Sequence, residues 1–146
     1  MHDINTAKIS LSTSIGIIGA FIADMLGGWD GNIIALVVLM CIDFIMGLLI
    51  AIFWGKSAKS TNGGLSSAAC WRGIIKKVCT LFVVVAAVQA DKLLGMDFVR
   101  NTVIIGFCVS EIISILENAA VMGILPETVK KAFDKVIDLL KSDKDK

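Results

Sequence analysis

Long apolar runs alternate with short polar stretches along most of the chain. A helix that crosses a membrane needs about 20 mostly apolar residues, because about 30 Å of hydrocarbon must be spanned at about 1.5 Å per residue. Four runs approach this length, and they cover residues 9–26, 33–53, 74–94 and 99–116. The pattern therefore predicts an all-α integral membrane protein with about four transmembrane helices.

Two of these runs need a further argument. The first could instead be a signal peptide, since Lys8 precedes a short apolar core. Cleavage before Asp24 would require small residues where Phe21 and Ala23 stand, so we expect a span. The third run is short, but Lys76 and Lys77 can extend toward the membrane surface, so that residues 74–94 suffice.

The last part of the chain has a different pattern. Gly123 and Pro126 interrupt the apolar sequence, and Glu127 then opens a stretch with one apolar side. We therefore divide the chain into a transmembrane domain, residues 1–126, and a cytoplasmic amphipathic helix with a charged tail, residues 127–146. This helix could lie on the membrane surface, pair with its copies, or fold back on the second loop. Its apolar residues at helical spacing are Val129, Phe133, Val136 and Leu140.

Lysine and arginine are distributed unevenly among the predicted loops. The first loop, residues 27–32, has none, and the third has only Lys92 and Arg100, whereas the tail has six lysines. Short loops rich in these residues stay in the cytoplasm, so this alternation predicts four spans with both termini inside. Tryptophans at the span ends and basic residues beside them are expected to anchor the helices at the interface: Trp29, Trp54, Trp71, Arg72, Lys76 and Lys77. The second loop, unlike the first and third, is rich in lysine and arginine: Lys56, Lys59, Arg72, Lys76 and Lys77.

Composition supports a membrane protein and disfavours several other classes. Apolar residues make up 56% of the chain, against about 45 to 50% in soluble domains. The net charge of +1 gives no basis for nucleic-acid binding. A single histidine, His2, and four cysteines without a Cys-x-x-Cys pair predict no catalytic triad, no metal site, no cofactor and no enzymatic activity. The cysteines are expected to be small apolar residues in helices.

Carboxylates inside predicted spans need an explanation, because each costs about 2.5 to 3.5 kcal/mol on insertion scales. Asp43 lies in the second span and Glu111 in the fourth, with Gln89 in the third as a polar neighbour. These side chains could line a pore, or a helix interface that becomes one. They could equally be protonated, or hydrogen-bonded to Ser110 or Ser114, and serve packing alone.

Small residues recur at intervals of four in the first and fourth spans, which allows helix backbones to approach closely. These contacts could form within one subunit or between subunits. The candidates for oligomer packing are Gly16, Gly19, Ala20, Ala23, Gly106 and Ser110.

From Trp29 onward, a series of motifs resembles the phage lysis and toxin-secretion holins, including the clostridial toxin-release holin. An aspartate stands four residues before a glycine in the second span, and the sequence DKLLG closes the third span at residues 91–95. The most specific motif is EIISILENAA at residues 111–120, followed by Gly123 and Pro126. Members often carry a second proline, which this chain lacks.

The resemblance implies a holin that forms homo-oligomers in the bacterial cytoplasmic membrane and opens lesions at a programmed time. Its expected partners are membrane lipid, further copies of itself and an endolysin or toxin as cargo, with an antiholin as a further candidate. A small ion channel or transporter subunit, and a membrane scaffold without a pore, are the alternatives. The candidates for the pore or the helix interface are Asp43, Gly47, Gln89, Glu111, Ser114, Glu117 and Asn118.

Overall fold

The computed structural model describes the backbone of residues 2–55 and 64–142, and the side chains of residues 8, 10–55, 64–133 and 135. Every regular element in these residues is helical, as the sequence predicts. Lys56, Lys59, the side chains of Val136 and Leu140 and the last four residues lie outside the described part. The elements are α1 (His2–Met25), α2 (Gly31–Leu49), the π-helical segment η1 (Ile50–Trp54), α3 (Ser67–Leu94), α4 (Val99–Met122) and α5 (Glu127–Ser142).

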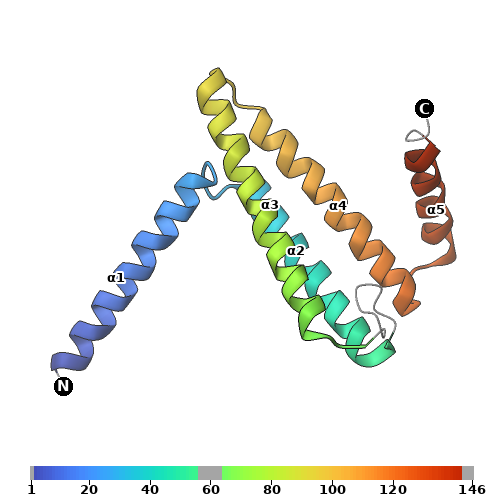
Figure 1. Cartoon of the computed structure of the whole chain (residues 1–146), viewed down its shortest axis with the longest axis horizontal. Coiled ribbons are helices and arrows are strands. Elements are labelled where there is room, and N and C mark those ends of the chain that lie inside the picture. Colours follow the sequence, from blue (N-terminus) through green and yellow to red (C-terminus); the bar gives the residue numbers. More distant parts are fainter. Residues whose placement is uncertain (1, 56–63, 143–146) are drawn as a thin grey trace.

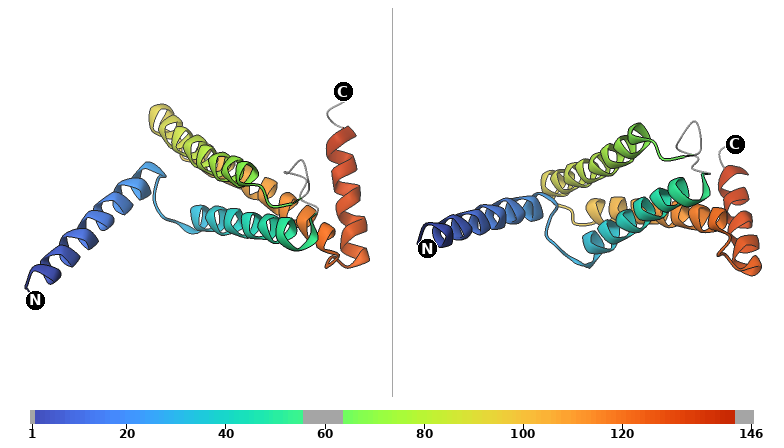
Figure 2. Two further views of the ribbon diagram at one scale, coloured as in Figure 1. Left: turned by 60° about the horizontal axis from the view of Figure 1, so that its bottom comes forward. Right: turned by 90° about the horizontal axis from the view of Figure 1, so that it is seen from below.

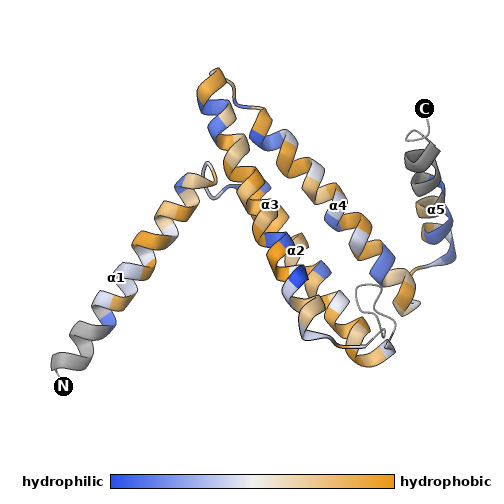
Figure 3. Cartoon of the chain, viewed as in Figure 1, coloured by the Kyte–Doolittle hydropathy of each residue, from blue (hydrophilic) through white to orange (hydrophobic). Residues whose placement is uncertain are grey.

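Three of the described helical stretches are long and apolar enough to cross a membrane: Gly31–Trp54, Ser67–Leu94 and Val99–Met122. Figure 3 shows the dominance of apolar residues along them. In α1 the apolar stretch is shorter, Ser10–Met25, so the first span stays a prediction. The span bounds 74–94 and 99–116 stay a prediction, and they lie within the longer helices α3 and α4. Glycines with positive φ, Gly95 and Gly123, end them.

Helices α2, α3 and α4 form a bundle in which α2 and α4 run in the same direction and α3 runs against them (Figure 1). Both α2 and α3 pack along α4, and they touch each other little. Helix α1 extends away from the bundle, and α5 turns away from the end of α4, in all views (Figures 1 and 2). We call the end with residues 26–30 and 95–98 the turn end, and the opposite end the lysine-rich end.

The inner positions of the three bundle helices are spaced alternately three and four residues apart. Such spacing places one row of side chains toward the neighbouring helices. These inner rows are buried or half-buried throughout. They comprise Ile33, Leu36, Met40, Asp43, Gly47 and Ile50 in α2; Lys77, Leu81, Val84, Val88 and Asp91 in α3; and Arg100, Ile104, Phe107, Glu111, Ser114 and Asn118 in α4.

The inner rows are apolar between Asp91 and Arg100, which lie at the turn end, and the middle of the bundle, and they carry polar side chains toward the lysine-rich end. The apolar half forms the core, where Ile33, Leu36, Val84 and Ile104 have no exposed surface. Leu26 and Met40 complete this cluster. Because lipid is as apolar as these side chains, close packing rather than removal from water holds them together. The polar half needs hydrogen bonds instead.

Candidate functional site

The polar half of the bundle is organised around the ammonium group of Lys77 in α3. Its Nζ atom donates to Oδ2 of Asp43 in α2 at 3.0 Å and to Oε2 of Glu111 in α4 at 2.7 Å. The three side chains have 18%, 6% and 14% of their surface exposed, respectively. One cation thus joins all three helices of the bundle. We call Asp43, Lys77 and Glu111 the ion triad.

The second carboxylate oxygen of Asp43 accepts hydrogen bonds from two side chains of α4. Ser114 donates its hydroxyl to Oδ1 at 2.6 Å, and Nδ2 of Asn118 donates to the same atom at 3.0 Å. Ser114 and Asn118 lie four residues apart, so one face of α4 presents both donors. Every buried side-chain nitrogen or oxygen in the described residues has a hydrogen-bond partner.

The ion triad holds two carboxylates against one ammonium. Its formal charge is −1 when all three groups are ionised, and such a group in a membrane is costly unless its hydrogen bonds are complete. The network satisfies the groups only while α2, α3 and α4 remain together. Separating the helices would expose them to lipid or require water to enter. The ion triad therefore links the three helices to one another.

A cleft of about 600 Å³ lies beside the ion triad, between α2, α3 and α4. Gly47 and Glu117, both predicted site residues, line it next to Asp43 and Glu111. Gln89 does not join this site. It lies exposed on α3, because it is one residue beyond the inner position Val88. Among the described residues, no three His, Cys, Asp or Glu side chains are arranged to hold a metal ion.

The predicted packing residues lie mostly outside the bundle. Gly16, Gly19 and Ala20 are exposed on α1, and Ala23 is half-buried. A Cβ atom added at Gly16, Gly19 or Gly106 would meet no atom within 4 Å. Ser110 is exposed at the edge of the cleft.

The predicted interface anchors divide between the two ends of the bundle. Trp29 lies at the turn end, and Trp54 and Trp71 lie at the lysine-rich end, all exposed. Arg72 and Lys76 are exposed on α3. Lys77 instead points inward to the carboxylates, and the spacing of the inner row of α3 is the signal that could have shown this.

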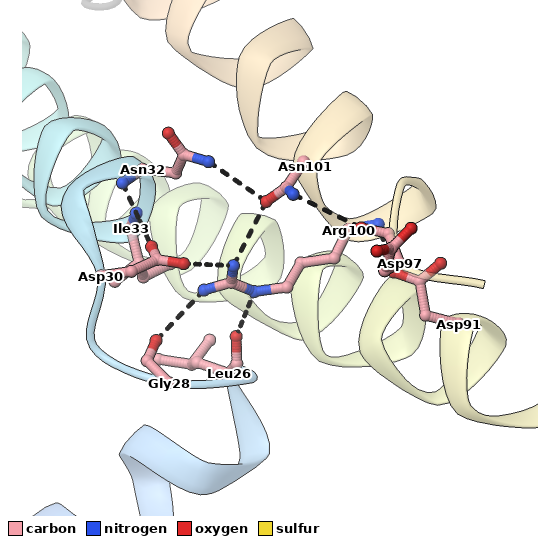
Figure 4. A network of polar contacts seen from close by, with 9 residues as sticks. All are labelled: Leu26, Gly28, Asp30, Asn32, Ile33, Asp91, Asp97, Arg100 and Asn101. Carbon is pink, nitrogen blue, oxygen red and sulfur yellow. Dashed lines mark hydrogen bonds and ion pairs between the residues drawn. The ribbon is translucent and has the colours of Figure 1, made fainter. Parts of the chain in front are cut away.

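Sequence reasoning also missed a second polar cluster, at the turn end (Figure 4). Arg100, which is 8% exposed, donates from Nε to the carbonyl of Leu26 at 2.6 Å and from Nη2 to the carbonyl of Gly28 at 3.1 Å. Its Nη1 atom donates to Oδ2 of Asp30 at 2.7 Å. Arg100 thereby fastens the turn between α1 and α2 to the start of α4. We call these contacts the arginine clamp.

Two carboxylates at the turn end, Asp30 and Asp91, bind the backbone N–H groups at the starts of α2 and α4. Asp30 accepts hydrogen bonds from the backbone of Asn32 and Ile33 and so caps α2. Asp91, near the end of α3, accepts from the backbone N–H groups of Val99 and Arg100 at 3.0 and 2.9 Å. Carboxylates at helix starts satisfy unpaired N–H groups and the helix dipole. The cluster therefore holds the turn between α1 and α2 against the turn between α3 and α4.

Gly27 leaves room for the arginine clamp. Its φ angle is +78°, and a Cβ atom there would lie 2.8 Å from Nε of Arg100. Any other residue would be strained and would displace the guanidinium.

The hydrogen bond from Arg100, together with the N–H groups of α2, lowers the pKa of Asp30 from its ordinary value of 3.8. The folded state therefore favours the ionised carboxylate. This contribution to stability is complete above pH 3.8 and is lost as the pH falls below that value, through the lower folded pKa. In detergent-solubilised protein, the thermal stability of the wild type should fall relative to that of Asp30→Asn as the pH is lowered below 3.8. A difference that stays constant with pH would contradict the assignment.

Residues 20–141 match the model of the bacteriophage holin family. An uncharacterised protein of Clostridium perfringens is 31% identical over 88% of this chain and 91% of its own length. A second, a 14.9 kDa protein of the same species, is 34% identical over 82% and 86%. An uncharacterised protein of Listeria innocua is 38% identical over 80% of both chains. No solved structure matches.

Proposed function

Because the chain belongs to the bacteriophage holin family, whose members are non-enzymatic and permeabilise membranes, we propose that it forms homo-oligomers in the bacterial cytoplasmic membrane and opens lesions there. The lesions release an endolysin or a toxin and lead to lysis of the host. The ion triad is the observation that supports this proposal most directly. Its three polar groups are enclosed by three apolar helices, and the same groups could line water after the helices separate.

The proposed topology has four spans with both termini in the cytoplasm. Helix α1 provides the first span, and α5 lies on the cytoplasmic side. The distribution of lysine and arginine supports this orientation. The short apolar stretch of α1, Ser10–Met25, would have to be extended by polar residues that reach the interface.

In this proposal, contacts between subunits use surfaces that a single chain leaves open. Gly16 and Gly19 lie exposed on α1 with no atom within 4 Å of an added Cβ, as does Gly106 on α4. Close approach of another helix at these positions would gain packing contacts without a steric cost. Two further small residues, Ala20 and Ser110, are exposed on the same helices.

Induced expression in a bacterium tests the function. Growth should stop and the membrane potential should fall abruptly, followed by release of a folded cytoplasmic reporter enzyme. Steady growth with an intact potential would contradict the proposal. Liposomes that hold dyes of graded size separate the alternatives: a small ion channel would pass ions but no folded protein, and a scaffold would release nothing.

Neutralising either carboxylate of the ion triad should advance the onset of depolarisation. Asp43→Asn and Glu111→Gln each remove one anionic partner of Lys77, which weakens the closed bundle by about 1 to 2 kcal/mol and shifts the equilibrium about five- to thirtyfold. Onset is measured with a potential-sensitive dye at equal membrane levels. Asp97→Asn, which neutralises an exposed carboxylate at the turn end, is the control. Unchanged timing in both triad variants would leave these residues with a packing role.

A further inference from the structure

The cleft beside the ion triad has polar side chains along its length. It begins at the segment before α3, where Ser66 lines it, and it reaches Thr80, one helical turn beyond the lysine of the ion triad. Lys76 and Glu117 line the stretch between these ends, and Ser110 lines the inner part. A polar surface therefore leads from the lysine-rich end to the ion triad. The apolar part of the lining includes Phe44, Leu48, Ala51, Leu65, Phe107 and Ile113.

The cleft extends about halfway through the thickness of a bilayer. Trp71, which is 64% exposed at the lysine-rich end, marks the level of the lipid headgroups, which indole rings prefer. From Trp71 to Thr80, α3 advances by nine residues, or about 14 Å at about 1.5 Å per residue, against about 30 Å of hydrocarbon. The polar lining therefore continues well below the membrane surface.

An apolar barrier closes the bundle between the ion triad and the turn end. The next inner residue of α2 in that direction after Asp43 is Met40, which is 4% exposed. Val84 and Ile104 belong to the same packed cluster and have no exposed surface. Water finds no hydrogen-bond partners among these side chains, so a continuous path of water from the lysine-rich end stops at the ion triad.

The charges of the lining balance, which favours water in the cleft over an ion of either sign. A polar cavity holds water when it offers hydrogen-bond partners and enough room. A volume of about 600 Å³ holds on the order of 20 water molecules at about 30 Å³ each. An acyl chain in the same place would remove water from charged side chains, which is costly. The charged lining residues are Arg72, Lys76 and Lys77, and Asp43, Glu111 and Glu117.

We infer that the cleft is a water-filled half-channel within a single chain. It opens at the lysine-rich end and ends at the ion triad, and the apolar cluster around Val84 and Ile104 seals it from the turn end. Water and small solutes therefore enter it from one end only. This inference rests on the proposed function and deepens it: the cleft is the first half of the permeation path, and the apolar cluster is the barrier that remains.

Labelling of single cysteines with a charged methanethiosulfonate reagent, which does not cross membranes, tests the inference. The four native cysteines are replaced by alanine, and Ser110→Cys is compared with Val109→Cys. Both positions are exposed and adjacent in α4, but only Ser110 lines the cleft. Because the thiolate is the reactive form and does not form in lipid, Ser110→Cys should react about a hundredfold faster. Equal rates would overturn the half-channel. Circular dichroism checks the helical content of each variant.

Membrane vesicles of both orientations show from which end the reagent enters. They are prepared at low expression from cells with an intact membrane potential, so labelling is measured whether or not the chain later permeabilises the membrane. Ser110→Cys should react in the preparation that labels Glu127→Cys, at the start of α5. It should stay unlabelled in the preparation that labels Asp97→Cys, which is exposed at the turn end. Reaction from the turn end would show that the apolar cluster is no barrier and would overturn the inference.

A last pair of variants tests whether the reagent passes through the cleft itself. Ala69→Leu narrows the cleft without changing its charge, so it should slow the labelling of Ser110→Cys several-fold. The matched control is Ala68→Leu, which makes the same change at the preceding, exposed residue outside the cleft and should leave the rate unchanged. Equal rates in the two variants would mean that the reagent reaches Ser110→Cys by another route, and the inference would be wrong.

Discussion

Replacing Lys77 by methionine should destabilise the folded bundle by about 3 to 5 kcal/mol. Methionine keeps the length and apolar stem of lysine but removes the ammonium that joins Asp43 to Glu111. Two carboxylates then face each other with no cation between them, and removing one partner from a buried ionic group costs this much. Each carboxylate would bind a proton or draw water between the helices. The measurement is the unfolding free energy in mixed detergent micelles, followed by circular dichroism.

The neighbouring residue provides the control for this prediction. Lys76→Met makes the same chemical change one position along α3, where the exposed ammonium forms no ion pair with a described residue. It should change stability by less than about 0.5 kcal/mol. The triple variant Asp43→Asn/Lys77→Met/Glu111→Gln should recover most of the loss, since it leaves no unpaired charge. Equal stability of the two single variants, or no recovery in the triple variant, would show that the ion triad does not hold the bundle together.

Replacing Arg100 by leucine should cost about 2 to 4 kcal/mol and release the turn between α1 and α2. The carbonyls of Leu26 and Gly28 lose their donors, and Asp30 loses its cation. Buried acceptors left without a partner carry penalties of about 1 to 3 kcal/mol each, reduced at Asp30 because its side chain is 47% exposed. Limited proteolysis should then cut residues 26–30 before the rest of the chain. Thermal unfolding measures the accompanying loss of stability.

Two variants define what the arginine clamp requires. Arg100→Lys keeps the charge but lacks the planar fork that contacts Leu26, Gly28 and Asp30, so it should rescue only part of the stability. Lys92→Met alters an exposed basic residue at the same end and should leave proteolysis unchanged. If Arg100→Leu is cut no faster than the Lys92 variant, the contacts of Arg100 do not control the position of α1.

The sequence predicted the helical class and the position of each bundle helix because these depend on local properties. An apolar run of sufficient length must be helical in lipid, since its backbone groups have no other partners there. Asp43 and Glu111 were found for a related reason: carboxylates stand out within an apolar run. Ser114 was named as a hydrogen-bonding partner for them, and Asn118 came from the motif that resembles the holins. In the structure Ser114 and Asn118 donate to the carboxylate of Asp43, and Lys77 joins this carboxylate to Glu111.

The basic residues that bind carboxylates from another part of the chain were much harder to predict. Lys77 lies near the end of its apolar run, where lysine usually reaches toward water. Arg100 was counted with a short predicted loop, where nothing marked it as buried. Gln89 was chosen for its polarity, although its position in the repeat turns it outward. Spacing alone could have separated these cases, because Lys77 and Arg100 fall on the inner rows and Gln89 does not.

The sequence by itself determined that this chain is helical and apolar enough for a membrane, and which carboxylates are out of place there. Only the tertiary structure decided which cation neutralises them, and that α1 is fastened through Arg100 while the rest of it leaves the bundle. The reason is physical. Hydropathy and helix formation are properties of neighbouring residues, whereas an ion pair between α2 and α3 depends on how three helices are rotated and aligned against one another.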